Sequence, residues 1–106
     1  MSAPVLAPDA RVEEGAQLHA PCFVDSGAHI KAGAVVGPYA VIGRGVIVEE
    51  EANVSASIIW PNSRIAQHAE VESAIVGRNC HVGRNVTLRA AVVLGDKTML
   101  TDYTRI

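Results

Sequence analysis

An aliphatic residue returns every six positions along almost the whole chain. Across residues 36–47 the six-residue unit is clearest, with an aliphatic residue first, Gly second and a small or branched apolar residue fifth. The first residues of the units are Leu6, Val12, Leu18, Val24, Ile30, Val36, Ile42, Val48, Val54, Ile59, Ile65, Val71, Val76, Val82, Leu88, Leu94, Leu100 and Ile106. Only the steps from Val54 to Ile59 and from Val71 to Val76 are five residues long. A period this short predicts a β-helix built from hexapeptide repeats.

The fifth residue of each unit is also expected to face the core. These residues are Ala10, Ala16, Cys22, Ala28, Ala34, Ala40, Val46, Ala52, Ile58, Ser63, Ala69, Ile75, Cys80, Val86, Val92, Thr98 and Thr104. None of them is charged, and all charged residues avoid both predicted inward positions. Every glycine falls at the second or fourth position, and three asparagines join the fourth. Because Gly and Asn tolerate positive φ, we expect the backbone to turn there.

Three units make one triangular coil of 17 or 18 residues. The predicted coils are 6–23, 24–41, 42–58, 59–75 and 76–93, with an incomplete sixth at 94–106. Neighbouring coils would stack as parallel strands about 4.8 Å apart. The alternative is an antiparallel sandwich of short strands, but its hairpins would need turn clusters every 8–12 residues. The pattern thus predicts an all-β, single-stranded parallel β-helix of five to six triangular coils, without helices.

Composition and charge narrow the class of protein. The 106 residues suffice for one domain, residues 1–106, with 49% hydrophobic and 19% charged residues. A net charge of −2 argues against a general nucleic-acid binder, because there is no basic surplus to neutralise phosphates. The chain shows neither a secretion signal nor an apolar run of membrane-spanning length, so we expect no membrane partner and a cytoplasmic location.

The hexads resemble the left-handed β-helix of the hexapeptide-transferase superfamily, and the handedness is implied by that resemblance. Residues 57–65 (Ser-Ile-Ile-Trp-Pro-Asn-Ser-Arg-Ile) and 72–79 (Glu-Ser-Ala-Ile-Val-Gly-Arg-Asn) look like the C-terminal β-helix of sugar nucleotidyltransferases, especially the mannose-1-phosphate guanylyltransferase family. Residues 91–96 resemble the closing coil of those proteins. The resemblance implies an assembly or regulatory domain, or a free-standing relative of one.

The catalytic part of that family is missing from the sequence. Its Gly-rich G-G-x-G-T-R-L loop, which cradles nucleotide phosphates, has no match here, and no catalytic nucleotidyltransferase domain is expected within the chain. We therefore predict no catalytic residue and no cofactor, and do not expect the chain alone to be an enzyme. The expected partners are further copies of the chain, meeting through β-helix faces or ends, and its own N-terminal catalytic domain.

A hexapeptide acyltransferase that uses acetyl-CoA is the alternative function. Such enzymes use one histidine as a general base, and here His81 lies in a pair of Gly-x-Asn hexads that resemble theirs. The long loop that usually covers their site is absent. No metal site is expected, because His29 and His81, which share a hexad position, would lie three coils apart, about 14 Å by strand spacing.

Several side chains off the inward positions are candidates for binding. Trp60, Tyr39 and Tyr103 are candidate interface residues, since exposed aromatic side chains suit docking. The third-position arginines Arg44, Arg78 and Arg84 are candidates for anion binding, although a solvated corner is the simpler interpretation. Cys22 and Cys80 should be buried and reduced, because they fall about four coils apart. Residues 1–53 hold three basic and seven acidic residues (net −4), whereas residues 54–106 hold six and four (net +2).

Overall fold

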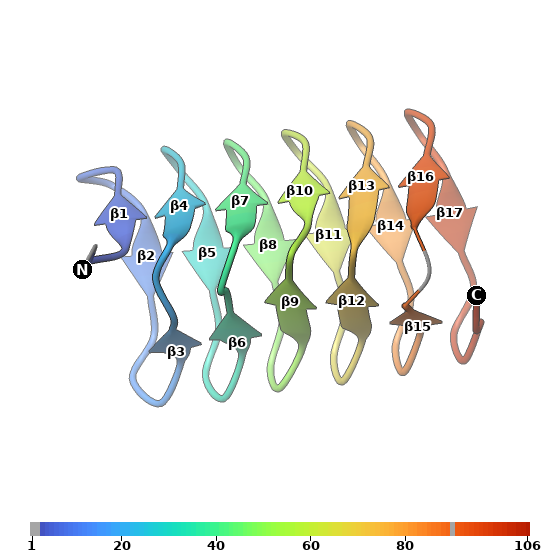
Figure 1. The fold of residues 1–106 in the computed structure, drawn as a ribbon, viewed down its shortest axis with the longest axis horizontal. Helices are drawn as coiled ribbons and strands as arrows, with labels where there is room; N and C mark the ends of the chain where they lie inside the picture. The colour runs from blue at the N-terminus through green and yellow to red at the C-terminus, as the bar shows by residue number, and fades with distance from the viewer. Residues whose placement is uncertain (1–2, 90) are drawn as a thin grey trace.

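A computed structural model describes residues 3–89 and 91–106, and within them every regular element is a short β-strand. Figure 1 shows strands rising on the near side, the chain passing behind at the top, and strands descending on the far side. Because the chain meanwhile advances from the N-terminal to the C-terminal end, the coil is left-handed. The prediction of a left-handed parallel β-helix is confirmed. None of the described residues forms a helix long or apolar enough to cross a membrane.

Each complete coil contributes one strand to each of three parallel sheets, which form the sides of a triangular prism. Sheet A contains β1 (Val5–Leu6), β4 (Cys22–Val24), β7 (Ala40–Ile42), β10 (Ile58–Ile59), β13 (Ala74–Val76) and β16 (Val92–Leu94). Sheet B contains β2 (Arg11–Val12), β5 (His29–Ile30), β8 (Ile47–Val48), β11 (Arg64–Ile65), β14 (His81–Val82) and β17 (Met99–Leu100). Sheet C contains β3 (Gln17–Leu18), β6 (Val35–Val36), β9 (Asn53–Ser55), β12 (Glu70–Glu72) and β15 (Thr87–Leu88). The molecule measures 32 × 22 × 22 Å.

The core is a single column along the coil axis, filled by the two inward sets of the repeat. From the second coil to Leu94 the aliphatic first residues are buried, and small residues such as Ala28, Ala34 and Ala40 pack beside them. A small side chain fits next to a bulky one at each corner, which keeps the column close-packed. The first coil is open at its end, and Leu6 is correspondingly exposed.

The two five-residue units depart from the predicted pattern. Ile58 and Ile75 were expected to face inward, but they are 42% and 41% exposed, whereas Ser57 and Ala74 are buried. The residue directly before an aliphatic first residue shares its strand and must therefore point to the opposite face. The prediction for Ile58 and Ile75 is wrong, because the small inward residue lies two positions before the next aliphatic first residue. That position belongs to Ser57 and Ala74.

Corners form where the repeat places Gly and Asn at its fourth position. From Gly15 onward, the fourth residue of every hexad that joins sheet A to B or B to C has positive φ. These residues are Gly15, Gly27, Gly33, Gly45, Glu51, Asn62, His68, Asn79, Asn85, Lys97 and Tyr103. The second-position Gly43 instead has an ordinary φ, and an added Cβ would lie 2.7 Å from the Ile59 carbonyl oxygen. That glycine therefore serves close packing of coils, not the turn itself.

Candidate functional site

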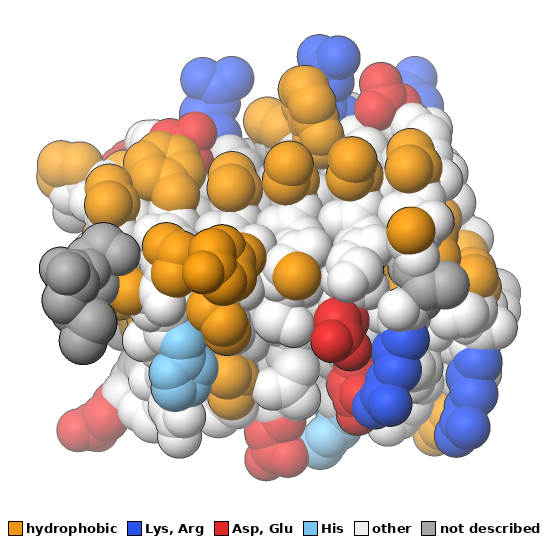
Figure 2. Space-filling model, in the orientation of Figure 1, with side chains coloured by type: hydrophobic (Ala, Val, Ile, Leu, Met, Phe, Trp, Pro, Cys, Tyr) orange, Lys and Arg blue, Asp and Glu red, His pale blue; other side chains and the backbone are white. Residues whose placement is uncertain are grey.

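Sheet A presents an unbroken row of apolar side chains to solvent. The register pairs these outward residues from coil to coil as Val5, Phe23, Val41, Ile58, Ile75 and Val93. All six are exposed, by fractions from 37% for Phe23 to 72% for Val93. Figure 2 shows this row as a band of hydrophobic atoms running across the molecule. We name these six side chains the sheet A row.

The outward rows of the other two sheets are mixed in character. On sheet B the row is Arg11, His29, Ile47, Arg64, His81 and Met99. On sheet C it is Gln17, Val35, Asn53, Glu70 and Thr87. Charged and polar groups therefore interrupt both, as expected of a solvated sheet face. Within the described part of the chain, only sheet A exposes a continuous apolar surface.

Two exposed aromatic side chains flank the middle of the sheet A row. Tyr39 lies at the corner between β6 and β7, and Trp60 lies at the opposite corner, between β10 and β11. Next to Tyr39 is an open hollow of about 410 Å³, lined by Pro21, Phe23, Val41 and other apolar residues. Trp60 borders a second hollow of about 220 Å³, which also reaches Val41, Ile58 and Asp25. The face is thus an apolar ridge with a hollow on either side.

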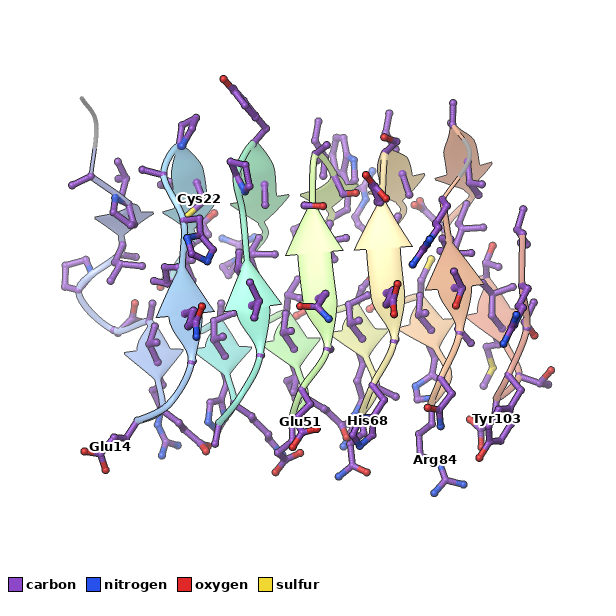
Figure 3. All side chains as sticks on the ribbon, turned by 60° about the horizontal axis from the view of Figure 1, so that its bottom comes forward. Glu14, Cys22, Glu51, His68, Arg84 and Tyr103 are labelled. Atoms are coloured by element: carbon purple, nitrogen blue, oxygen red, sulfur yellow. The ribbon has the colours of Figure 1, made fainter. Side chains whose placement is uncertain are left out.

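The third aromatic candidate, Tyr103, lies elsewhere. It follows β17 at the corner between sheets B and C, and Figure 3 shows it on the same corner as Glu51, His68 and Arg84. Its backbone N–H donates to the Arg84 carbonyl oxygen at 2.8 Å. The structure thus brings Tyr39 and Trp60 to the sheet A face and separates Tyr103 from them.

The three candidate arginines are also divided between corners. Arg44 and Arg78 lie between sheets A and B, whereas Arg84 lies between sheets B and C. The Arg78 guanidinium sits 5.5 Å from the centre of the Trp60 ring, and its Nε is 3.8 Å from an Asp96 carboxylate oxygen. This cation–π contact holds the Trp60 indole at the edge of the sheet A face. The structure does not gather the three arginines into one anion site.

Arg84 is committed to a carboxylate in the next coil. Its backbone N–H and guanidinium donate to Asp102 at 2.8 and 3.0 Å. The Arg84 backbone N–H and then its side chain hold the pKa of Asp102 below its ordinary value. The side-chain hydrogen bond to Asp102 raises the pKa of Arg84. This exposed pair joins adjacent coils and contributes little energy.

His81 faces solvent on sheet B, with Arg64 and Met99 as its neighbours along the outward row. A general base is usually oriented by a carboxylate or carbonyl on its second ring nitrogen. No such hydrogen bond to the His81 ring is found among the described residues. The role of His81 under the acyltransferase alternative stays a prediction.

Two acid–base pairs on sheet B were not predicted from the sequence. His29 Nε2 lies 2.5 Å from a Glu13 carboxylate oxygen, and the Arg64 guanidinium pairs with the buried Glu49 carboxylate. The available signal was spacing, because residues 15 or 16 apart fall in adjacent coils.

No group of three potential metal ligands occurs in residues 3–89 and 91–106.

The two cysteines are buried and unlinked, as predicted. Burial raises the pKa of the Cys22 thiol, which therefore stays protonated and unreactive. The Cys80 sulfur lies 3.1 Å from the Gly95 carbonyl oxygen, where it can donate a weak hydrogen bond. Both thiols serve as small core groups.

Comparison with known families settles the membership of the chain. A sequence model of the GMPPB C-terminal domain matches residues 18–106. The chain belongs to the GMPPB C-terminal domain family. That range covers the β-helix except for the first two hexads of its first coil. Membership in this family agrees with the resemblance carried by residues 57–65 and 72–79.

Curated relatives of this GMPPB C-terminal domain are much longer than the chain itself. Mannose-1-phosphate guanylyltransferase 1 of Arabidopsis thaliana is 30% identical over 93 residues, which is 88% of the chain and 26% of the relative. The bifunctional protein GlmU of a Jannaschia species is 35% identical over 85 residues, 74% of the chain and 18% of the relative. The chain thus spans about a quarter or less of these proteins.

Solved structures share the β-helix of this GMPPB C-terminal domain. The UDP-N-acetylglucosamine acyltransferase from Campylobacter jejuni superposes with a TM-score of 0.72 at 24% identity, over 95% of the chain and 45% of that structure. The corresponding Francisella novicida acyltransferase gives 0.71 at 19% identity, over 96% and 43%. At these identities the likeness shows the fold alone.

Proposed function

We propose that the chain is the non-catalytic assembly domain of a sugar-1-phosphate nucleotidyltransferase of the mannose-1-phosphate guanylyltransferase type. The observation that carries the proposal is the sheet A row, an apolar surface that runs the full length of the domain. Contiguous exposed apolar patches on soluble domains mark sites of protein association. Family membership supports the same role, with the nucleotidyl transfer itself residing in a separate catalytic domain.

The partners proposed are further copies of the chain and the catalytic domain of the same protein. Tyr39 and Trp60 are the proposed anchors, because large aromatic side chains near the centre of an interface carry most of its energy. Tyr103, on another corner, would contribute only to a different contact. The buried, unlinked thiols of Cys22 and Cys80 support a cytoplasmic location, where thiols stay reduced.

Light scattering of the purified chain over a range of concentrations tests this function. We expect a defined oligomer at micromolar concentrations, because an exposed apolar row of this length favours association. A monomer at every concentration that can be measured would contradict the proposal.

Calorimetric titration with acetyl-CoA separates the proposal from the acyltransferase alternative. A non-catalytic assembly domain should give no heat of binding at micromolar concentrations. Stoichiometric binding, abolished by His81→Ala, would replace the assembly role by the acyltransferase role.

A further inference from the structure

We propose that the sheet A face binds the same face of a second copy of this chain, in a twofold dimer with antiparallel coil axes. This inference rests on the proposed assembly role and specifies the partner and the geometry. The twofold axis would run along the strand direction, midway between β7 and β10. The sheet A row of one copy would then lie on the sheet A row of the other.

The dimensions of the face fit a partner of the same shape. Six strands at about 4.8 Å spacing make the sheet A row roughly 24 Å long. The 32 and 22 Å extents of the molecule limit the flat area of the face to about 700 Å², which is comparable to the roughly 800 Å² that each partner buries in a standard interface. A second flat face of equal length can cover this area, whereas a small ligand would fill only one of the hollows.

The chemistry of the sheet A row suits pairing with itself. The row contains no charged side chain, so a twofold contact places no like charges opposite each other along its length. In a twofold interface each residue pair occurs twice. The proposed axis puts Val41 opposite Ile58, Phe23 opposite Ile75, and Val5 opposite Val93. Each of these pairs brings two apolar side chains into contact across the interface.

Charge selects the antiparallel over the parallel orientation. Residues 1–53 carry a net charge of −4 and residues 54–106 a net +2. A parallel dimer would place the two acidic halves side by side, whereas an antiparallel one sets each acidic half beside a basic half. At the corner between sheets A and B, Asp25 follows β4 and Arg78 follows β13. These strands face each other in the antiparallel dimer, so each Asp25 meets Arg78 of the second copy.

The two exposed aromatic residues fall beside the proposed axis. Tyr39 precedes β7 and Trp60 follows β10, and these are the two central strands of sheet A. The antiparallel arrangement sets Trp60 at the level of Arg44 in the second copy, which allows a cation–π contact. It sets Tyr39 at the level of Ala56, whose small side chain leaves room for the ring. Large aromatic residues at the centre are typical of interface hot spots.

Two valine variants test which face is used. Val41→Glu places a charge at the centre of the sheet A row, and Val35→Glu places the same charge on sheet C between Gln17 and Asn53. Sedimentation should give a dimer for the unmodified chain and for Val35→Glu, and half that mass for Val41→Glu. Circular dichroism confirms that both variants remain folded. A dimer that survives Val41→Glu, or a trimer, would overturn this inference and leave the assembly role standing, whereas an unmodified chain that is a monomer would remove both.

Cysteine cross-linking tests the orientation. Phe23→Cys and Ile75→Cys chains, mixed and treated with a bifunctional thiol reagent that spans about 10 Å, the separation of sheets packed face to face, should cross-link between unlike chains, because these positions face each other in the antiparallel dimer. Each variant alone should stay unlinked, since its own thiols would lie a further three strand spacings, or about 14 Å, apart along the coil axis. Efficient linkage of Phe23→Cys to itself would establish parallel axes and overturn the proposal. The unmodified chain, with its buried native thiols, measures the background.

Discussion

Single residues at the corners carry a backbone conformation that their side chains do not favour. Lys97 has a φ of 65°, in the region that Gly and Asn tolerate best, and its N–H donates to the Arg78 carbonyl oxygen. We expect Lys97→Asn to raise the free energy of unfolding by about 0.5–1 kcal/mol, because it relieves this strain and keeps the hydrogen bond. Lys31→Asn, at the only other lysine and outside the left-handed region, is the control in denaturant titration. An equal gain at both positions would show that backbone strain is not the cause.

At the scale of the coil, two buried serine hydroxyl groups make hydrogen bonds to the next coil where the backbone makes none. Ser57 follows β9, donates to the Ser55 carbonyl oxygen at 2.7 Å and accepts the Ala74 N–H of the next coil at 3.0 Å. Ser63 accepts the Cys80 N–H and donates to the Gly77 carbonyl oxygen in the same way. Serine at these inward positions therefore links successive coils.

Removing one of these hydroxyls should cost more than its small volume suggests. Ser57→Ala leaves the buried N–H of Ala74 without a partner, which we expect to lower the free energy of unfolding by about 1–3 kcal/mol. Ser55→Ala, two residues away in β9, leaves that N–H bonded and should be nearly neutral. Denaturant unfolding of both variants measures the difference. Equal costs would mean that the Ala74 N–H finds another acceptor.

The repeat in the sequence determines the coil, because each inward residue must recur at the right spacing and must also fit the core. The six-residue period predicts the strands, the corners and most of the core, since aliphatic first residues alternate with fifth residues that are mostly small. It fails at Ile58 and Ile75, where counting forward from the preceding aliphatic residue ignored the alternation within the following strand. Hydrophobicity alone favoured Ile58 over Ser57 as the inward residue, yet strand geometry decides otherwise.

The same miscount hid most of the candidate site. Tyr39 and Trp60 could be recognised individually as exposed aromatic residues. The sheet A row could not, because counting forward from the preceding aliphatic residue places Ile58 and Ile75 in the core, which interrupts the row. Its signal is present in the sequence, where the residue before the aliphatic first residue is apolar in every third unit. Which side chains meet across coils, as Arg78 and Trp60 do, depends on rotamers that no period specifies.

For the whole molecule, stability and association should be linked. Each coil contacts only its neighbours, so a β-helix gains stability by adding contacts along its axis or against a partner. A dimer formed through sheet A would cover apolar side chains in all six coils at once. Anything that binds the folded chain but not the unfolded one raises its apparent stability by mass action.

Thermal unfolding should therefore depend on protein concentration. We expect the midpoint of the unmodified chain to rise by several degrees over a concentration range on the order of a hundredfold, because unfolding must also separate the two copies. Val41→Glu should unfold at a midpoint that does not change with concentration, and Val35→Glu should behave like the unmodified chain. Circular dichroism at matched heating rates measures all three. A midpoint of the unmodified chain that stays constant would mean that the sheet A face contributes no association energy, whereas a dependence retained in Val41→Glu would place the stabilising contact on another surface.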